Sequence, residues 1–318
     1  MSFEKPPKTH TTEEKSDALI YSLESGVRVR LNAKEILPDN KLDNFDKTKA
    51  IVLIPGWEAE TENKTTISLS KDFADESKSR TFAITSETEK SDNEELNNLY
   101  EESVAISKFI KEKNLKKIKI VGYSIGGDKA INVAYLLQDD PEIEVEGLIL
   151  LASTGLYNQK PKELTTNLLR DAFVKTPLDM PKNRSGTNDF KKWIDVAKDL
   201  GLNVLAKSNS SPSHIGKILK KIKETSRLNE KANELKIPMV LINGKEDFVS
   251  DQKKIVPIEE DTKDKIKLRE KYLKENLFKK SPYIKMLTPS KSSNHGLSYF
   301  RSKSIAKASL YLIDKFNK

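Results

Sequence analysis

The chain has 318 residues, a formal net charge of +8 and no cysteine; 36% of its residues are hydrophobic and 33% are charged. This length is sufficient for one sizeable core with an inserted subdomain, and the absence of cysteine excludes disulfides, thiolate catalysis and cysteine-based metal sites. No apolar run approaches the roughly 20 residues that cross a bilayer. Residues 1–16 also lack the apolar centre of a signal peptide, so we expect a flexible tail on a cytoplasmic protein.

The excess of positive charge comes from 56 basic and 48 acidic residues. A nucleic-acid-binding protein concentrates such an excess on one face, with aromatic or arginine side chains to read the bases. Here lysines alternate with acidic residues along segments such as 263–280. This pattern favours a solvated, lysine-rich surface and no nucleic-acid partner.

The first elements in chain order are predicted as an antiparallel hairpin and a buried strand. Residues 18–25 and 27–33 have alternating patterns that are separated by Ser25 and Gly26. Residues 49–56 are a continuous β-branched run, which is typical of a strand buried on both faces. The next elements are predicted as a helix at residues 65–79 and a short strand at residues 81–85. A second helix is predicted at residues 91–114, with Ser91 or Asp92 as its cap.

The second half of the chain alternates buried strands with amphipathic helices. The strands are predicted at residues 117–123, 145–153, 237–244 and 281–289, and the helices at 125–138 and 297–316. This alternation predicts an α/β fold with a mainly parallel sheet and helices on both faces. The interval 155–235 has only helical patterns, around residues 162–174, 189–200 and 214–235, and is predicted as an inserted helical cap. The cap would divide the core into residues 17–154 and 236–318.

One motif carries chemistry: the stretch IVGYSIGGDKA at residues 120–130 places Ser124 between Gly122 and Gly126. A serine hydroxyl is a weak nucleophile that needs exposure, a neighbouring base and donors for the oxyanion. A sharp strand-to-helix turn supplies the exposure, and its crowding requires glycines two residues before and after the serine. The alternative is a turn serine that caps the helix beginning at Ile125.

The motif in this context resembles the α/β-hydrolase family, over residues 17–154 and 236–318. In that family the nucleophile is followed along the chain by an acid and then by a histidine. The resemblance implies the α/β-hydrolase fold and assigns Ser124 as the nucleophile.

The candidate base is His295, in the stretch SSNHGLSY between the last predicted strand and the final helix. The resembling family places its catalytic histidine on this loop. The other two histidines are His10, in the predicted tail, and His214, at a predicted helix start where capping is a sufficient explanation.

The candidate acid is Asp247, in LINGKEDFV directly after a predicted strand. This position resembles the turn after the seventh strand of the family. Glu246 and Asp251 remain alternatives. The other position used in the family, after the sixth strand, holds Ser153 and Thr154, which offer no carboxylate.

The oxyanion donors are expected to be the backbone N–H groups of Ile125 and of the loop Pro55-Gly56-Trp57. Pro55 stands where the family usually has histidine, and a proline has no N–H to donate. Gly56 or Trp57 must therefore donate, and Trp57 is the preferred candidate.

The resulting hypothesis is a serine hydrolase that cleaves an ester, thioester or amide bond of a small-molecule acyl substrate through an acyl-enzyme on Ser124. Such a triad needs no cofactor and no metal. Two alternatives stay open: an acyltransferase that uses the same triad, and a non-catalytic binding module of the same fold. The sequence does not indicate the acyl length or the oligomeric state.

Overall fold

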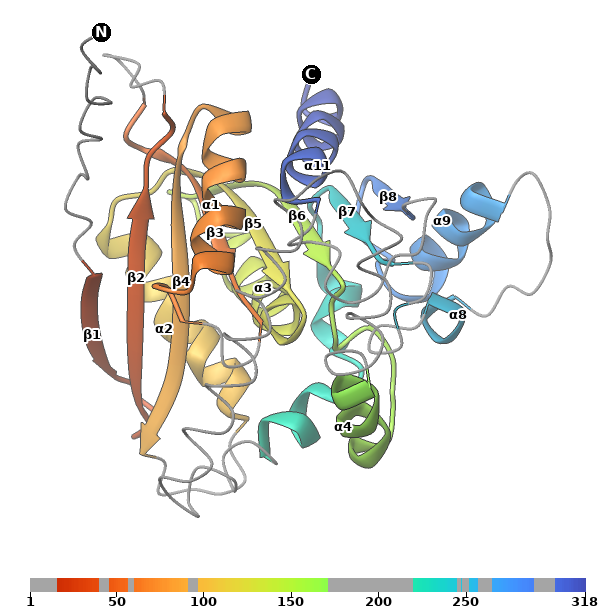
Figure 1. Ribbon diagram of the computed structural model, residues 1–318, viewed down its shortest axis with the longest axis horizontal. Helices are drawn as coiled ribbons and strands as arrows, with labels where there is room; N and C mark the ends of the chain where they lie inside the picture. The colour runs from red at the N-terminus through yellow and green to blue at the C-terminus, as the bar shows by residue number, and fades with distance from the viewer. Residues whose placement is uncertain are drawn as a thin grey trace, which may run out of the picture.

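The computed structural model describes residues 16–39, 46–56, 60–90, 97–170, 220–244, 247, 252–256, 265–288 and 301–318. The described strands form an eight-stranded sheet in the order β1-β2-β4-β3-β5-β6-β7-β8 (Figure 1). These strands are β1 (Ser16–Ser22), β2 (Arg28–Ile36), β3 (Lys49–Ile54), β4 (Arg80–Lys90), β5 (Lys117–Tyr123), β6 (Glu144–Leu151), β7 (Met239–Ile242) and β8 (Ile284–Leu287).

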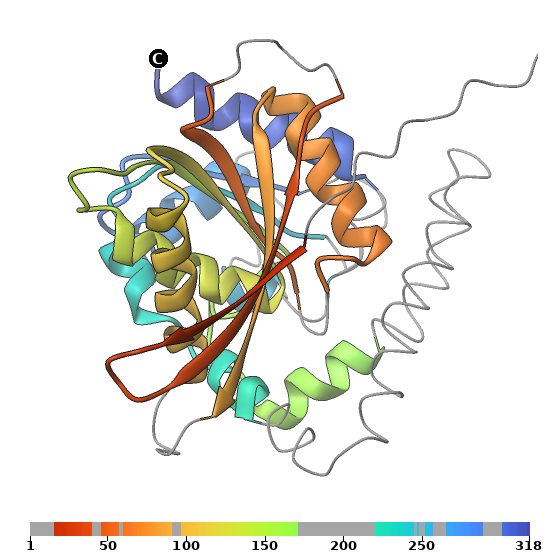
Figure 2. The same ribbon diagram turned by 90° about the vertical axis from the view of Figure 1, so that its left-hand side faces the viewer.

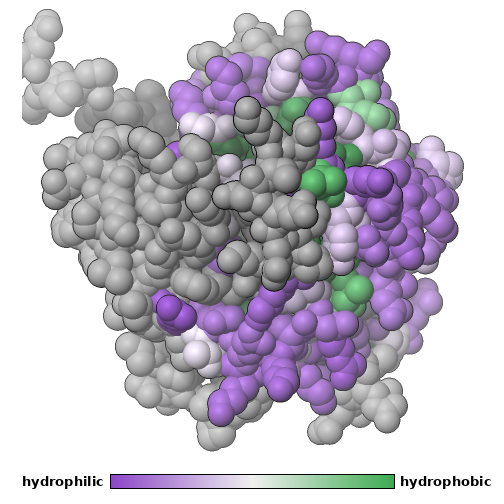
Figure 3. Space-filling view, turned by 90° about the vertical axis from the view of Figure 1, so that its right-hand side faces the viewer, coloured by the Kyte–Doolittle hydropathy of each residue, from purple (hydrophilic) through white to green (hydrophobic). Residues whose placement is uncertain are grey.

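The α-helices with their observed bounds are α1 (Lys64–Ser77), α2 (Asn98–Glu112), α3 (Ile125–Leu137), α4 (Pro161–Arg170), α8 (Gln252–Ile255), α9 (Lys265–Asn276) and α11 (Ser302–Phe316). A helical segment at 220–225 and the 3-10 helix η3 (Glu230–Glu234) precede β7. None of the described helices is long and apolar enough to cross a membrane. The described side chains on the face that carries α8, α9 and β8 are mostly hydrophilic (Figure 3).

The sheet confirms the predicted fold class. The hairpin β1–β2 and the pair β2–β4 are antiparallel, and every other neighbouring pair is parallel. Helices α1 and α11 pack together on one face, and α2 and α3 pack together on the other (Figure 2). The carboxyl ends of all the parallel strands therefore meet at one edge of the sheet.

Strand β3 shows why its sequence is continuously apolar. Its residues Val52 and Ile54 belong to the same core cluster as α2 and α3, while Ile51 and Leu53 belong to the cluster that contains α1 and α11. All four side chains are at most 1% exposed. Because both faces of the strand are covered, no position along it favours a polar residue.

Two element bounds differ from the sequence-based expectation. Strand β4 extends to Lys90 instead of ending at residue 85, because it pairs with the whole of the long strand β2. Helix α2 begins at Asn98 and not near residue 92, because Asn97 has an extended backbone and its side chain accepts a hydrogen bond from Tyr100 N at 3.1 Å. A capping side chain at Asn97 fixes the start of the helix better than the apolar spacing does.

The predicted cap is described only at its two ends. Helix α4 follows β6, and the predicted helix 214–235 is wrong in its extent, because the helical segment ends at residue 225. Asn229 accepts a hydrogen bond from Lys231 N and starts the separate 3-10 helix η3. Residues 171–219, with the predicted helix 189–200, lie outside the described residues. We name residues 220–229 the return segment, since they lead the chain back toward β7.

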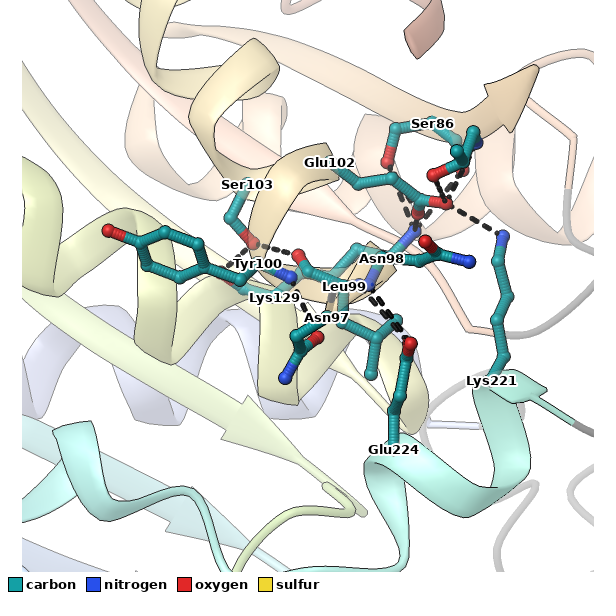
Figure 4. A network of polar contacts seen from close by, with 11 residues as sticks. Ser86, Asn97, Asn98, Leu99, Tyr100, Glu102, Ser103, Lys129, Lys221 and Glu224 are labelled. Carbon is teal, nitrogen blue, oxygen red and sulfur yellow. Dashed lines mark hydrogen bonds and ion pairs between the residues drawn. The ribbon is translucent and has the colours of Figure 1, made fainter. Parts of the chain in front are cut away.

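The return segment is joined to the core by a buried ion network (Figure 4). Glu102 of α2 has a fully buried side chain and lies 2.5 Å from Lys129 Nζ of α3 and 3.1 Å from Lys221 Nζ of the return segment. Ser86 and Thr88 of β4 donate further hydrogen bonds to the same carboxylate. Burial alone would raise the pKa of Glu102, but the two lysines outweigh it and hold the pKa at about 2.

A second contact ties the return segment to the start of α2. Glu224 accepts hydrogen bonds from the backbone N–H groups of Asn98 at 2.9 Å and of Leu99 at 3.3 Å (Figure 4). These N–H groups have no partner within the helix, and a carboxylate at a helix N-terminus also interacts favourably with the helix dipole. The return segment thus caps a helix that lies more than a hundred residues earlier in the chain.

Replacing Glu102 by glutamine would remove the negative charge that faces the buried Lys129 and the half-buried Lys221. We expect the Glu102→Gln variant to lose about 3–5 kcal/mol in its free energy of unfolding, measured by urea denaturation. The matched control is Glu275→Gln, which removes the exposed pair of Lys271 and Glu275. That control should change the free energy of unfolding by less than about 1 kcal/mol. Equal effects of the two substitutions would contradict a structural role for the network.

Candidate active site

Ser124 occupies a sharp turn between strand β5 and helix α3. Its backbone has φ 55° and ψ −125°, a conformation that L-residues rarely adopt and that costs about 1–3 kcal/mol. Its side chain makes no capping hydrogen bond to α3. Helix capping therefore does not explain the serine, and the strained backbone requires another reason.

The glycines around Ser124 permit close backbone approach. A Cβ atom on Gly126 would lie 2.2 Å from the carbonyl oxygen of Ile54, and one on Gly122 would lie 2.5 Å from the Cα of Gly127. Both distances are far below van der Waals contact. The motif therefore has a steric basis: a side chain at residue 126 would clash with the end of β3, and one at residue 122 would clash with α3.

The loop after β3 runs alongside Ser124, as the expected oxyanion loop should. A Cβ atom on Gly56 would lie 3.0 Å from the Cβ of Ser124. Trp57, the preferred donor of this loop, lies outside the described residues. The described part of the loop thus brings residue 56 beside the serine and leaves the role of Trp57 a prediction.

The carbonyl group of Ser124 accepts three hydrogen bonds. The donors are Gly127 N at 2.9 Å, Thr154 N at 3.1 Å and the hydroxyl of Thr154 at 3.3 Å. The N–H of Ser124 donates to Leu151 O at 3.0 Å. The end of β6 therefore holds the peptide that joins Tyr123 to Ser124, while Thr154, in the loop after β6, and Gly127 hold the peptide that joins Ser124 to Ile125.

Asp247 follows β7 at the same edge of the sheet. Its side chain is buried, at 3% exposure. Ser124 is buried to the same extent, so the exposure that the motif predicts for the serine is not observed. Its N–H donates to Gly244 O at 3.4 Å, which places it on a tight turn after the strand. The structure thus describes two of the three candidate triad residues. The candidate base His295 lies outside the described residues, as do the alternatives Glu246, Asp251, His10 and His214.

Asp128 is a buried acid that the sequence reasoning did not single out. It lies in the first turn of α3, is 5% exposed, and accepts hydrogen bonds from Asn229 of the return segment. Burial raises its pKa to about 7. The available signal was a carboxylate in IGGDKAINVA, a stretch of mostly small or apolar residues, since an aspartate is rarely buried without a specific partner.

Within the described ranges, no three histidine, aspartate or glutamate side chains lie close enough together to hold a metal ion. The chemistry available to the described part of the site is that of hydroxyl, carboxyl and backbone N–H groups.

Gly126→Ala tests the steric constraint at the turn. Alanine favours helices by about 1 kcal/mol over glycine, so an unhindered site in the first turn of α3 would become more stable. The clash with Ile54 O should reverse the sign and lower the free energy of unfolding by about 1–3 kcal/mol. Urea denaturation measures the change, and a variant as stable as the parent would show that the turn is not closely packed.

Solved structures with the same fold cover nearly the whole chain. An esterase from Exiguobacterium antarcticum matches with a TM-score of 0.56 and 13% identity, over 93% of this chain and 98% of that chain. An α/β hydrolase fold protein from Chitinophaga pinensis has a TM-score of 0.59 and 12% identity, over 94% and 98%. A thermophilic esterase from Thermogutta terrifontis has a TM-score of 0.58 and 13% identity, over 96% and 100%. At these identities the likeness shows the fold alone.

Among curated proteins, no sequence match was found. The model of the family described as serine aminopeptidase, S33, matches residues 85–275, which is more than half of the chain. The matched region contains the Ser124 turn, Asp128 and Asp247. This chain therefore belongs to the serine aminopeptidase S33 family and is a hydrolase of the α/β-hydrolase fold.

Proposed function

We propose that this protein is a serine hydrolase that cleaves an ester, thioester or amide bond of a small-molecule acyl substrate through an acyl-enzyme on Ser124. The observation that carries the proposal is the backbone of Ser124, with φ 55° and ψ −125°, at a position where the side chain makes no capping hydrogen bond to α3. Strain of this kind persists where the surrounding structure enforces it and is concentrated at functional sites.

The oxyanion donors support this assignment. Ile125 is the first residue of α3, so its N–H has no acceptor within the helix and lies at the positive end of the helix dipole. Trp57 follows Gly56, which lies against Ser124. Its N–H is the second proposed donor, since Pro55 has none.

The order of the strands allows the triad to assemble. Ser124 follows β5 and Asp247 follows β7, and β8, the last strand before His295 in the sequence, ends at the same edge of the sheet. From β8 to β5 is three strand spacings, about 14 Å. Residues 288–294 can span up to roughly 23 Å when extended. His295 can therefore reach Ser124 from the end of β8 while Asp247 approaches the imidazole from the side.

In the proposed reaction Ser124 Oγ attacks the carbonyl carbon of the substrate and His295 takes the hydroxyl proton. The N–H groups of Ile125 and Trp57 stabilise the oxyanion. When the intermediate collapses, His295 returns the proton to the leaving oxygen, sulfur or nitrogen. Water then attacks the acyl-enzyme by the same sequence, and Asp247 stabilises the imidazolium in both halves.

We also propose that residues 155–235 form a cap over this site. Helix α4 and the helical segment 220–225 lie beyond the carboxyl ends of the parallel strands, on the side where Ser124 lies (Figures 1 and 2). Active sites of open α/β sheets lie at this edge. Ester substrates are favoured by the structural neighbours that are described as esterases.

The test is covalent labelling with a fluorophosphonate probe, which reacts only with an activated serine. We expect an adduct on Ser124, mapped by peptide mass spectrometry, that is lost in Ser124→Ala and His295→Ala. The matched controls are His214→Ala and Ser25→Ala, which should label like the parent protein.

Two other outcomes would overturn the proposal in different ways. A folded protein that is not labelled would favour the non-catalytic binding module. Labelling combined with transfer of an acyl group to an added alcohol or amine, in preference to water, would identify an acyltransferase.

The acid is tested separately by hydrolysis of p-nitrophenyl acetate. Asp247→Asn should lower kcat by about 10³- to 10⁴-fold, because the imidazolium loses its counter-charge and the histidine its orientation. Glu246→Gln and Asp251→Asn are the matched controls and should stay near the rate of the parent protein. A large loss in either control, with Asp247→Asn unaffected, would move the role of the acid to that residue.

A further inference from the structure

The peptide between Ser124 and Ile125 links the return segment to the proposed oxyanion donor. In a trans peptide the C=O and the N–H point in opposite directions. The three hydrogen bonds to Ser124 O therefore also set the direction of the Ile125 N–H. Hydrogen bonding at a carbonyl further polarises the peptide and strengthens its N–H as a donor.

One of these three donors is the first member of a buried chain of polar groups. The hydroxyl of Thr154, which donates to Ser124 O, lies 2.5 Å from the hydroxyl of Thr225. Thr225 in turn hydrogen-bonds the carboxyl group of Asp128. Thr154 and Thr225 are each 0% exposed, so water does not replace these contacts.

Asp128, the last of these polar groups, is held in place by its neighbours. Asn229 Nδ2 donates to Asp128 Oδ1 and, at 3.0 Å, to Asn132 Oδ1. Gly155 has φ 77°, and a Cβ atom there would lie 2.8 Å from Asp128 Cγ. The loop after β6 thus leaves room for the carboxyl group only because residue 155 is glycine.

Each threonine hydroxyl has one proton to donate. The direction in which the hydrogen bonds run between Asp128 and Ser124 O therefore depends on whether Asp128 is protonated. If Thr154 donates to Ser124 O, the short contact between the threonines requires Thr225 to donate to Thr154. Asp128 must then donate to Thr225, and it can do so only when it is protonated. If Asp128 is ionised, Thr225 donates to it, Thr154 donates to Thr225, and Ser124 O loses its hydroxyl donor.

We propose that Thr154, Thr225 and Asp128 form a hydrogen-bond relay that positions and polarises the Ser124–Ile125 peptide, so that the return segment controls the oxyanion donor. These residues act through the peptide and are positioning residues. The inference rests on the proposed function, since it assigns a role to the Ile125 N–H. It adds that the insertion contributes Thr225 and Asn229 to the support of the active site.

The charges around Asp128 make the relay responsive near neutral pH. Burial raises its pKa to about 7, the hydrogen bonds from Asn229 and Thr225 and the charge of Lys129 oppose the rise, and Glu224 adds to it. Beyond Lys129 lie Glu102 and Lys221, which form the buried ion network. Below this pKa Asp128 is protonated, and Thr154 donates its hydroxyl proton to Ser124 O. Above it Asp128 is ionised, and Thr154 donates to Thr225 instead.

The experiment measures the second-order rate constant of fluorophosphonate labelling between pH 5.5 and 9, with the thermal midpoint of each variant. Thr154→Val and Thr225→Val should label about tenfold more slowly at pH 6, the rate equivalent of one hydrogen bond. Thr154→Ser and Thr225→Ser should restore the rate, because they restore the hydroxyl. In the parent protein the rate should fall again above pH 7, and Asp128→Asn should abolish this fall, since an amide donates at every pH.

The matched control is Thr48→Val, which removes a threonine hydroxyl at the opposite edge of the sheet, where it bonds Asp46. Valine variants that label as fast as this control would overturn the relay. So would a loss that serine does not restore, or a fall above pH 7 that persists in Asp128→Asn. If a valine variant fails to fold, the serine variants and the pH profile of Asp128→Asn still test the relay. A parent protein that is not labelled would overturn the proposed function itself, whereas a labelled parent with unaffected variants would overturn the relay alone.

Discussion

The structure depends on one constraint, the turn from β5 into α3 at Ser124. The turn holds a positive φ at a non-glycine residue, and it fits only because Gly126 has no side chain to meet Ile54 O. The loop after β3 also sets Gly56 beside the serine, at the start of α3. Strain in the turn is offset by the buried sheet on which it sits, since β3, β5 and β6 are covered on both faces.

Several buried polar groups lie where the insertion returns to the core. Burying an ionised or polar side chain is unfavourable unless its partners are supplied, and here the partners come from far along the chain. Lys221 forms an ion pair with Glu102, Glu224 accepts a hydrogen bond from the start of α2, and Asn229 donates a hydrogen bond to Asp128. Each contact has one partner in the return segment, so the seating of this segment and the arrangement of α2 and α3 are interdependent.

Most of the fold could be predicted from the sequence, because its determinants are local. The apolar run of β3 indicates a buried strand and the glycine spacing around Ser124 indicates a tight turn from strand to helix, and the structure confirms the mainly parallel sheet. The start of α2 was predicted wrongly because apolar spacing extends past the true cap at Asn97. The role of Asp128 was missed because its partners, Thr225 and Asn229, are about a hundred residues away and are contributed by a segment without a recognisable motif. The proposed contacts of His295 and Trp57 involve residues outside the described part of the chain.

A crystal structure of the protein after reaction with a fluorophosphonate would test directly whether Ser124 is the nucleophile. We expect a phosphonyl group on Ser124 Oγ, with its oxygen about 3 Å from the backbone nitrogens of Ile125 and Trp57. We also expect His295 within hydrogen-bond reach of Ser124 Oγ, with Asp247 on the far side of the imidazole. An adduct on another residue, or a phosphonyl oxygen that points away from Ile125 N, would contradict the assignment of this turn as the catalytic centre.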